Sequence, residues 1–103
     1  MLKLQRITTA DTALYQFMEN LMKQAFPTAE YRDLDELRLY TDSKPHFYNN
    51  IIMEENHPIG FFTYWDFDTF YYAEHFAIDP ALRNGGYGKQ VLDLLCNSLP
   101  RPI

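Results

Sequence analysis

The sequence predicts an α/β fold in which helices pack on a mixed sheet, and its apolar patterns are the main reason. Four stretches alternate or run apolar as strands do: 2–7, 46–53, 59–65 and 70–78. Three stretches repeat apolar residues at intervals of three and four as helices do: 11–25, 29–40 and 90–96. The 103 residues contain no long linker or internal repeat, so we expect one domain over residues 1–103.

The first half of the chain predicts an edge strand followed by two helices. The first helix follows the polar residues Thr8 and Asp11 and ends at Phe26-Pro27. Its buried face is predicted to hold Leu14, Phe17, Met18, Leu21, Met22 and Ala25. The second helix is predicted from Ala29 to Tyr40, with Thr28 as its cap and a loop over 41–45. Its face opposite the apolar stripe carries the acidic residues Glu30, Asp33, Asp35 and Glu36.

The second half predicts a three-stranded meander. Strands over 46–53 and 59–65 are joined by a turn at 54–58, and residues 66–69 turn the chain into the strand from Phe70. Simple alternation along this last strand places Tyr72, Glu74 and Phe76 on one face. It places the other set on the opposite face: Tyr71, Ala73, His75 and Ala77.

A glycine-rich segment, Arg83-Asn84-Gly85-Gly86-Tyr87-Gly88-Lys89, separates the last strand from the last helix. Glycines leave amide N–H groups unobstructed, and a helix N-terminus attracts anions. The segment therefore predicts a phosphate cradle, to which Arg83 and Lys89 add positive charge. Two other phosphate-binding motifs are excluded by spacing. A dinucleotide fingerprint would require glycine where Val91 stands, and a Walker loop would require Ser or Thr at Gln90.

The spacing Arg-x-x-Gly-x-Gly, formed by Arg83, Gly86 and Gly88, resembles the acetyl-coenzyme A signature of the GCN5-related N-acetyltransferase (GNAT) family. Residues 73–80 resemble that family's fourth strand and its exit. The resemblance implies that acetyl-CoA is bound through its pyrophosphate by the glycine segment and through its pantetheine arm by the strand. The implied residues are Phe76, Ala77, Ile78, Arg83, Asn84, Gly85, Gly86, Tyr87, Gly88 and Lys89.

The same resemblance implies transfer of the acetyl group to a primary amine by direct attack. Glu74 is the first candidate for a general base, and His75 is the second, because the sequence leaves open which faces the substrate. Tyr64, Tyr71 and Tyr72 are candidates for protonating the thiolate, with a core role as the simpler interpretation. The acidic face of the second helix borders the implied acceptor site, although a solvated surface explains it as well. The three histidines lack metal-site spacing, so we expect no metal.

The resemblance covers the front of the family's domain, because the chain stops where the fifth strand is expected. The following helix and terminal hairpin are also missing from the pattern. One edge of the strand at 70–78 is then unpaired and apolar, which predicts a homodimer through that edge. Two other interpretations remain open. One is a truncated, non-catalytic module that binds coenzyme A or dimerises, and the other is a protein-interaction domain that uses its aromatic sheet.

The charge, the cysteine content and the absence of targeting signals indicate which partners the protein binds and in which cellular compartment it is found. The net charge is −5, and residues 1–80 hold 6 basic and 13 acidic side chains, which disfavours nucleic acid as a partner. The single cysteine, Cys96, excludes an internal disulfide and is predicted to lie on the buried face of the last helix. The sequence shows neither a secretory signal nor a membrane span, so we expect a cytoplasmic protein with no membrane partner.

Overall fold

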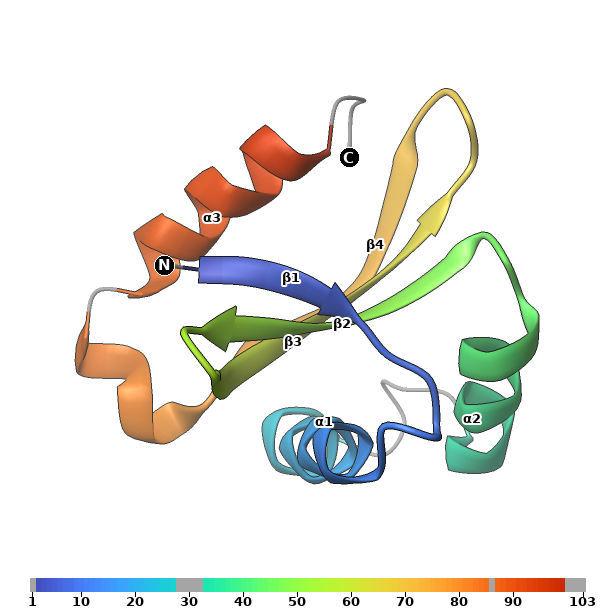
Figure 1. Ribbon diagram of the computed structural model, residues 1–103, viewed down its shortest axis with the longest axis horizontal. Helices are drawn as coiled ribbons and strands as arrows, with labels where there is room; N and C mark the ends of the chain where they lie inside the picture. The colour runs from blue at the N-terminus through green and yellow to red at the C-terminus, as the bar shows by residue number, and fades with distance from the viewer. Residues whose placement is uncertain (1, 28–32, 86, 100–103) are drawn as a thin grey trace.

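The computed structural model describes residues 2–27, 33–85 and 87–99. The elements run in the order β1 (Leu2–Arg6), α1 (Thr12–Ala25), α2 (Leu34–Ser43), β2 (Phe47–Glu54), β3 (His57–Asp66), β4 (Tyr71–Ile78), the 3-10 helix η2 (Pro80–Gly85) and α3 (Tyr87–Ser98) (Figure 1). This confirms the predicted α/β class and the predicted order of strands and helices. None of the helices in these three ranges is long and apolar enough to span a membrane.

The four strands form one sheet in the order β1-β2-β3-β4, and each neighbouring pair is antiparallel. Short hairpins join β2 to β3 and β3 to β4, which explains why strands adjacent in sequence are adjacent in space. At the first hairpin, Glu55 has a φ of 55° and helps to form a tight turn. The described part of the sheet therefore ends at β1 on one side and at β4 on the other.

Helices cover both faces of the sheet. Figure 1 shows α1 and α2 on one face and α3 on the other. Because successive strand residues point to opposite faces, Ile51 and Phe61 pack with α1 and α2, whereas Ile52 and Phe62 pack with α3. All four side chains are almost wholly buried. The fold thus contains two hydrophobic clusters with the sheet between them.

Helix α1 follows the predicted pattern closely. Met18, Leu21 and Met22 are buried against the sheet, as their spacing predicts. The helix ends at Ala25 because Phe26 has an extended backbone (φ −131°, ψ 142°) and precedes a proline.

Helix α2 differs from the prediction at both ends. The backbone of Asp33 is not helical (ψ 133°), and its carboxylate accepts hydrogen bonds from the amides of Asp35 (2.9 Å) and Glu36 (3.3 Å), so the helix begins at Leu34. The predicted cap Thr28 and residues 29–32 lie outside the described residues. The predicted loop at 41–43 is wrong, because the helix continues to Ser43 and buries Thr41.

Candidate active site

The predicted donor-binding region is built at the point where β4 leaves the sheet. The Asp79 amide donates to the Ile59 carbonyl (2.8 Å), which holds this end of β4 against β3. The Asp79 carboxylate accepts from the Ala81 amide (3.0 Å), and its carbonyl accepts from Leu82 (2.9 Å). These bonds turn the chain from the strand directly into η2, as the Asp-Pro pair predicts.

Helix α3 then starts close to the end of β4, and its apolar side chains pack against one face of the sheet. Val91, Leu95 and Leu99 are buried in the cluster formed with Ile52 and Phe62. The amides in the first turn of α3, at Tyr87 and the residues after it, lack intrahelical acceptors and carry the positive end of the helix dipole. The Lys89 side chain is exposed on this turn.

The described residues of the glycine segment have helical backbone conformations rather than those of a loop. Arg83, Asn84 and Gly85 lie in η2, whereas Tyr87, Gly88 and Lys89 already belong to α3. The predicted helix start at Gln90 is therefore wrong by one turn. Gly86 lies outside the described residues. The predicted cradle residues that are described thus follow one another from the end of β4 into the first turn of α3.

The last helix also corrects the expected position of the cysteine. Cys96 is exposed, because the buried face of α3 is formed by Val91 and Leu95 and is continued by Leu99 just after the helix. These residues recur at intervals of four, and Cys96 lies one residue beyond that stripe.

The three strand residues predicted to pair with the donor's arm lie in the last part of β4. Phe76 and Ile78 pack against the cluster under α3, whereas Ala77 packs against the cluster under α1 and α2. Within the described sheet β4 pairs with β3 alone, so its other edge faces no described strand. Backbone groups along that edge are suited to main-chain pairing with an extended ligand.

A β-bulge interrupts β4 at the candidate base. Thr63 of β3 pairs with His75 and Tyr64 pairs with Ala73, so Glu74 is the extra residue. The buried hydroxyl of Thr63 accepts a hydrogen bond from the His75 amide (3.1 Å), in place of a regular ladder bond. The bulge therefore brings Glu74 and His75, the two predicted catalytic residues, to an irregular point in the middle of the strand.

The bulge overturns the simple alternation predicted for β4. Tyr71 packs under α3 in the same cluster as Phe76, although alternation places these two residues on opposite faces. The His75 ring makes an edge contact with Phe26 at the end of α1, with ring centroids 4.9 Å apart. His75 therefore faces the helical layer of α1, and Tyr71 faces that of α3.

Two of the candidate thiolate acids lie in the core. Tyr64 and Tyr71 are 7% and 5% exposed and meet at ring centroids 5.3 Å apart. Burial raises the pKa of Tyr64 to about 12, so it holds its proton more tightly than an exposed tyrosine. This packing supports the structural interpretation of both residues.

An ion pair between a buried Glu19 and a half-exposed Arg38 joins the first two helices and has no counterpart in the sequence prediction. The Glu19 carboxylate is 2% exposed and accepts from Nε and Nη2 of Arg38 at 2.8 and 2.9 Å. The spacing of Glu19 relative to Tyr15 and Met22 places it on the buried face of α1, which is the signal that would have identified it. Asp35 also pairs with Arg38 (3.5 Å), so part of the predicted acidic face has structural partners.

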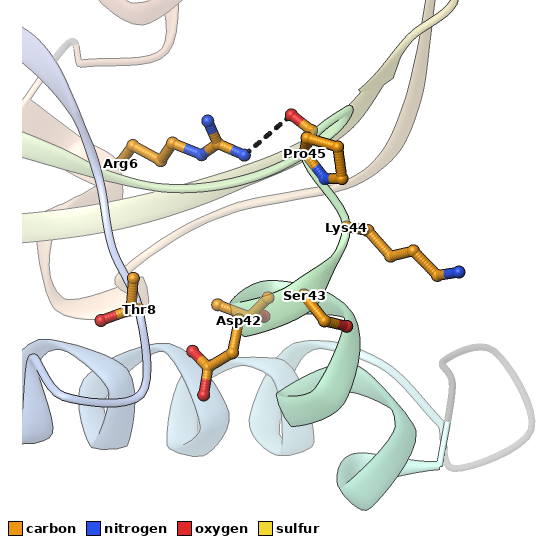
Figure 2. A pocket seen from close by; sticks show the side chains of 7 residues that line it. Arg6, Thr8, Asp42, Ser43, Lys44 and Pro45 are labelled. Carbon is orange, nitrogen blue, oxygen red and sulfur yellow. Dashed lines mark hydrogen bonds between the residues drawn. The ribbon is translucent and has the colours of Figure 1, made fainter.

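Two cavities lie beside these elements. One of about 160 Å³ is lined by Asp79 and by residues of α1, so it adjoins the exit of β4. The other, of about 330 Å³, lies between the β1–α1 and α2–β2 connections (Figure 2). Its lining is polar at several points, and Arg6 crosses it to donate to the Pro45 carbonyl (3.0 Å). Neither cavity is lined by Glu74 or His75, and no described cluster of three His, Cys, Asp or Glu is placed to hold a metal.

Comparisons with known proteins identify the family. The chain resembles a Bacteroides thetaiotaomicron protein that is assigned to the GNAT family of acetyltransferases, with 58% sequence identity and a TM-score of 0.95. The match covers 96% of this chain and 56% of that protein, so the chain spans about half the length of this relative. No curated protein matches the chain.

More distant structures share the fold. An aminoglycoside acetyltransferase from an uncultured soil metagenomic sample, solved with sisomicin, has 20% identity and a TM-score of 0.63 over 89% of this chain and 65% of its own. The same enzyme solved with trehalose gives 19% identity and a TM-score of 0.59. The model of the acetyltransferase (GNAT) family matches residues 12–101, and the chain therefore belongs to the GNAT family.

Proposed function

We propose that this chain binds acetyl-CoA and transfers the acetyl group to a primary amine by direct attack. One observation carries the proposal: β4 ends in the Asp79 turn and passes through the glycine segment into the N-terminus of α3, while its outer edge faces no described strand. Membership of the GNAT family supports the general class of reaction.

The donor would be held mainly by backbone groups. Amides from Asn84 to Lys89 would bind the pyrophosphate, with the charges of Arg83 and Lys89 and the dipole of α3 favouring the anion. The main chain of residues 76–78 would pair with the pantetheine arm as another strand does. Their side chains are already committed to the two hydrophobic clusters, which is consistent with a role for the backbone at these positions.

Catalysis requires a neutral amine and stabilisation of the oxyanion that forms as nitrogen attacks the thioester carbonyl. We assign Glu74 as the base that takes the proton of the ammonium, directly or through water, with His75 as the alternative. The bulge supports this assignment, because bulges redirect side chains and are over-represented next to active sites. Attack forms the carbon–nitrogen bond, and the carbon–sulfur bond breaks as the intermediate collapses. The second proton that the nitrogen loses would pass through solvent to the thiolate, which leaves as free thiol.

Isothermal titration with acetyl-CoA tests the donor site. We expect the wild-type chain to bind and Gly86→Trp to lose binding, because a large side chain in the glycine segment blocks approach to the amides. Asn97→Trp is the matched control, because it adds the same side chain at an exposed position late in α3. Folded wild-type chain that does not bind would refute donor binding by these residues alone.

Turnover separates the enzyme from a non-catalytic module that binds coenzyme A. We expect release of free thiol from acetyl-CoA in the presence of amines, and Glu74→Gln should lower kcat by roughly 10²- to 10⁴-fold. Glu55→Gln removes an equivalent charge at the exposed β2–β3 turn and should leave kcat unchanged. Donor binding without thiol release would favour the non-catalytic alternative.

We also propose a cytoplasmic homodimer that pairs through the edge of β4, within residues 70–78. When the donor's arm occupies residues 76–78, the partner strand would pair with the part of the edge that precedes them. The outer edge of β4 faces no strand within the described sheet, which supports the dimer, because such edges recruit further strands. Light scattering at high micromolar concentration tests it, and a stable monomer would contradict the dimer.

The acceptor class proposed is an amine that is cationic at neutral pH, which the acidic balance of the chain favours.

A further inference from the structure

The hairpin between β3 and β4 carries a row of aromatic side chains on one face. Trp65 and Phe67 stack with ring centroids 6.2 Å apart, and Phe67 meets Phe70 at 5.3 Å. Tyr72 lies directly opposite Trp65 in the strand register, so both project to the same face. Phe67, Phe70 and Tyr72 are 47%, 46% and 53% exposed, and we call these three residues the aromatic tip.

The aromatic tip is ordered by hydrogen bonds within the hairpin. The Phe67 amide donates to the Phe70 carbonyl (3.0 Å), and the Thr69 amide donates to the Phe67 carbonyl (2.8 Å). The Asp66 carboxylate accepts from the Asp68 amide (3.0 Å), and Asp68 takes the left-handed conformation (φ 71°) that aspartate tolerates in turns. The rings are therefore presented on a defined backbone, so a partner that binds them pays little ordering entropy.

The position of the tip favours a macromolecular partner. In Figure 1 the loop between β3 and β4 projects past both helical layers. None of the tip residues lines either of the two cavities described above, whereas small ligands generally occupy concave sites. Adjacent half-exposed aromatic rings on a projecting turn are instead typical of protein contact surfaces.

The charge around the tip specifies the chemistry of that partner. Three carboxylates lie in or near the hairpin: Asp66, Asp68 and Glu74, whereas Glu54, Glu55 and Asp79 lie at the opposite ends of the strands. One cation is close by, because the Lys44 ammonium lies over the Tyr40 ring, which contacts Trp65. Two of the carboxylates, Asp66 and Asp68, flank Phe67 directly. Aromatic faces and carboxylates both attract ammonium and guanidinium groups. A two-fold contact between the tips of two copies would instead oppose like charges, which disfavours a second copy as the occupant.

We propose that the aromatic tip is a docking surface for a lysine- and arginine-rich segment of a partner protein. Cationic side chains of that segment lie over Phe67, Phe70 and Tyr72, and Asp66 and Asp68 add charge attraction. This surface is separate from the donor region at the opposite end of β4, and it operates whether or not the chain transfers acetyl groups.

Fluorescence anisotropy with a labelled oligolysine peptide, in the absence of acetyl-CoA, tests the proposal. The double variant Phe67→Ser/Phe70→Ser should bind the peptide about 5- to 10-fold more weakly, because two cation–π contacts are lost. Leu39→Ser/Leu92→Ser is the matched control, since both leucines are exposed at 60% and 58% on other elements. This control should change binding less than twofold.

Replacing Phe67 and Phe70 could also disturb the packing of the turn. A second pair of variants therefore changes charge alone. Asp68→Asn retains the tolerance for the left-handed backbone and removes one charge, whereas Asp93→Asn removes a charge from the exposed side of α3. Asp68→Asn should weaken binding more than Asp93→Asn at low salt, and the difference should shrink as salt rises.

Three results would overturn the proposal. Equal losses in each variant and its matched control would mean that oligolysine binds the acidic surface without using the tip. Equal binding of the same peptide with its lysines acetylated would show that the partner is not cationic. Loss of a dimer in a Phe67→Ser variant, which leaves residues 70–78 unchanged, would identify a second copy as the occupant when measured by light scattering.

Discussion

Gly60→Ala should strain the sheet beside the proposed donor site. Gly60 of β3 pairs with Ile78, and a Cβ atom at this position would lie 2.4 Å from the Ala77 carbonyl oxygen and 3.2 Å from the Ile78 Cα. Real Cβ contacts essentially never fall below 3.0 Å, and the opposing atoms are backbone, so β4 itself has to move. Forcing an extra methyl group into a packed region costs about 1–3 kcal/mol of unfolding free energy.

Urea unfolding followed by the fluorescence of Trp65, the single tryptophan, measures this loss. Lys3→Ala, an exposed change on β1, is the control and should alter stability by less than ~0.5 kcal/mol. Because the strain falls on Ala77 and Ile78, acetyl-CoA binding to the folded variant should also weaken. Stability equal to that of the Lys3 variant would refute the argument, because it would mean that the two strands separate without cost.

Three further predictions concern the core. Arg38→Ala leaves the buried Glu19 carboxylate without its cation, whereas Glu19→Gln removes the charge, so urea titration should show the arginine variant to be the less stable. Since the pKa of Tyr64 is raised by burial from 10.0 to about 12, its contribution to stability is complete below pH 10 and is lost as pH rises towards 12; Tyr64→Phe should flatten this alkaline decline in unfolding titrations. Thr63→Val removes the acceptor of the His75 amide and should cost ~1–3 kcal/mol of unfolding free energy, whereas equal losses in Thr63→Ser, which keeps the hydroxyl, would contradict this role.

Much of the fold was predictable because periodicity records which face of an element is buried. The spacing of Met18, Leu21 and Met22 predicted the contact face of α1, and the paired apolar runs predicted the β2–β3 hairpin. The start of α2 was not predictable in this way, because acidic residues occur on both sides of it. Only the backbone shows that Asp33 is the cap rather than part of the helix.

The order of the elements that form the candidate site was predictable from the sequence. The pairing register between β3 and β4, which decides where each side chain points, was not. The Asp-Pro pair correctly indicated where β4 ends, whereas the glycines suggested a start for α3 that is one turn too late. The bulge at Glu74 left no comparable signal, because a single unpaired residue changes neither composition nor length. Alternation therefore failed for Tyr71, and the face that His75 presents became clear only from its contact with Phe26.

The division of the interior by the sheet has a consequence for how substitutions combine. Ile51 and Ile52 are neighbours in sequence but belong to different hydrophobic clusters, whereas Ile51 and Met18 are far apart in sequence and share one. Energetic coupling between substitutions requires shared packing partners. Epistasis in this protein should therefore follow the two faces of the sheet rather than distance along the chain, so that successive residues of one strand evolve with different helices.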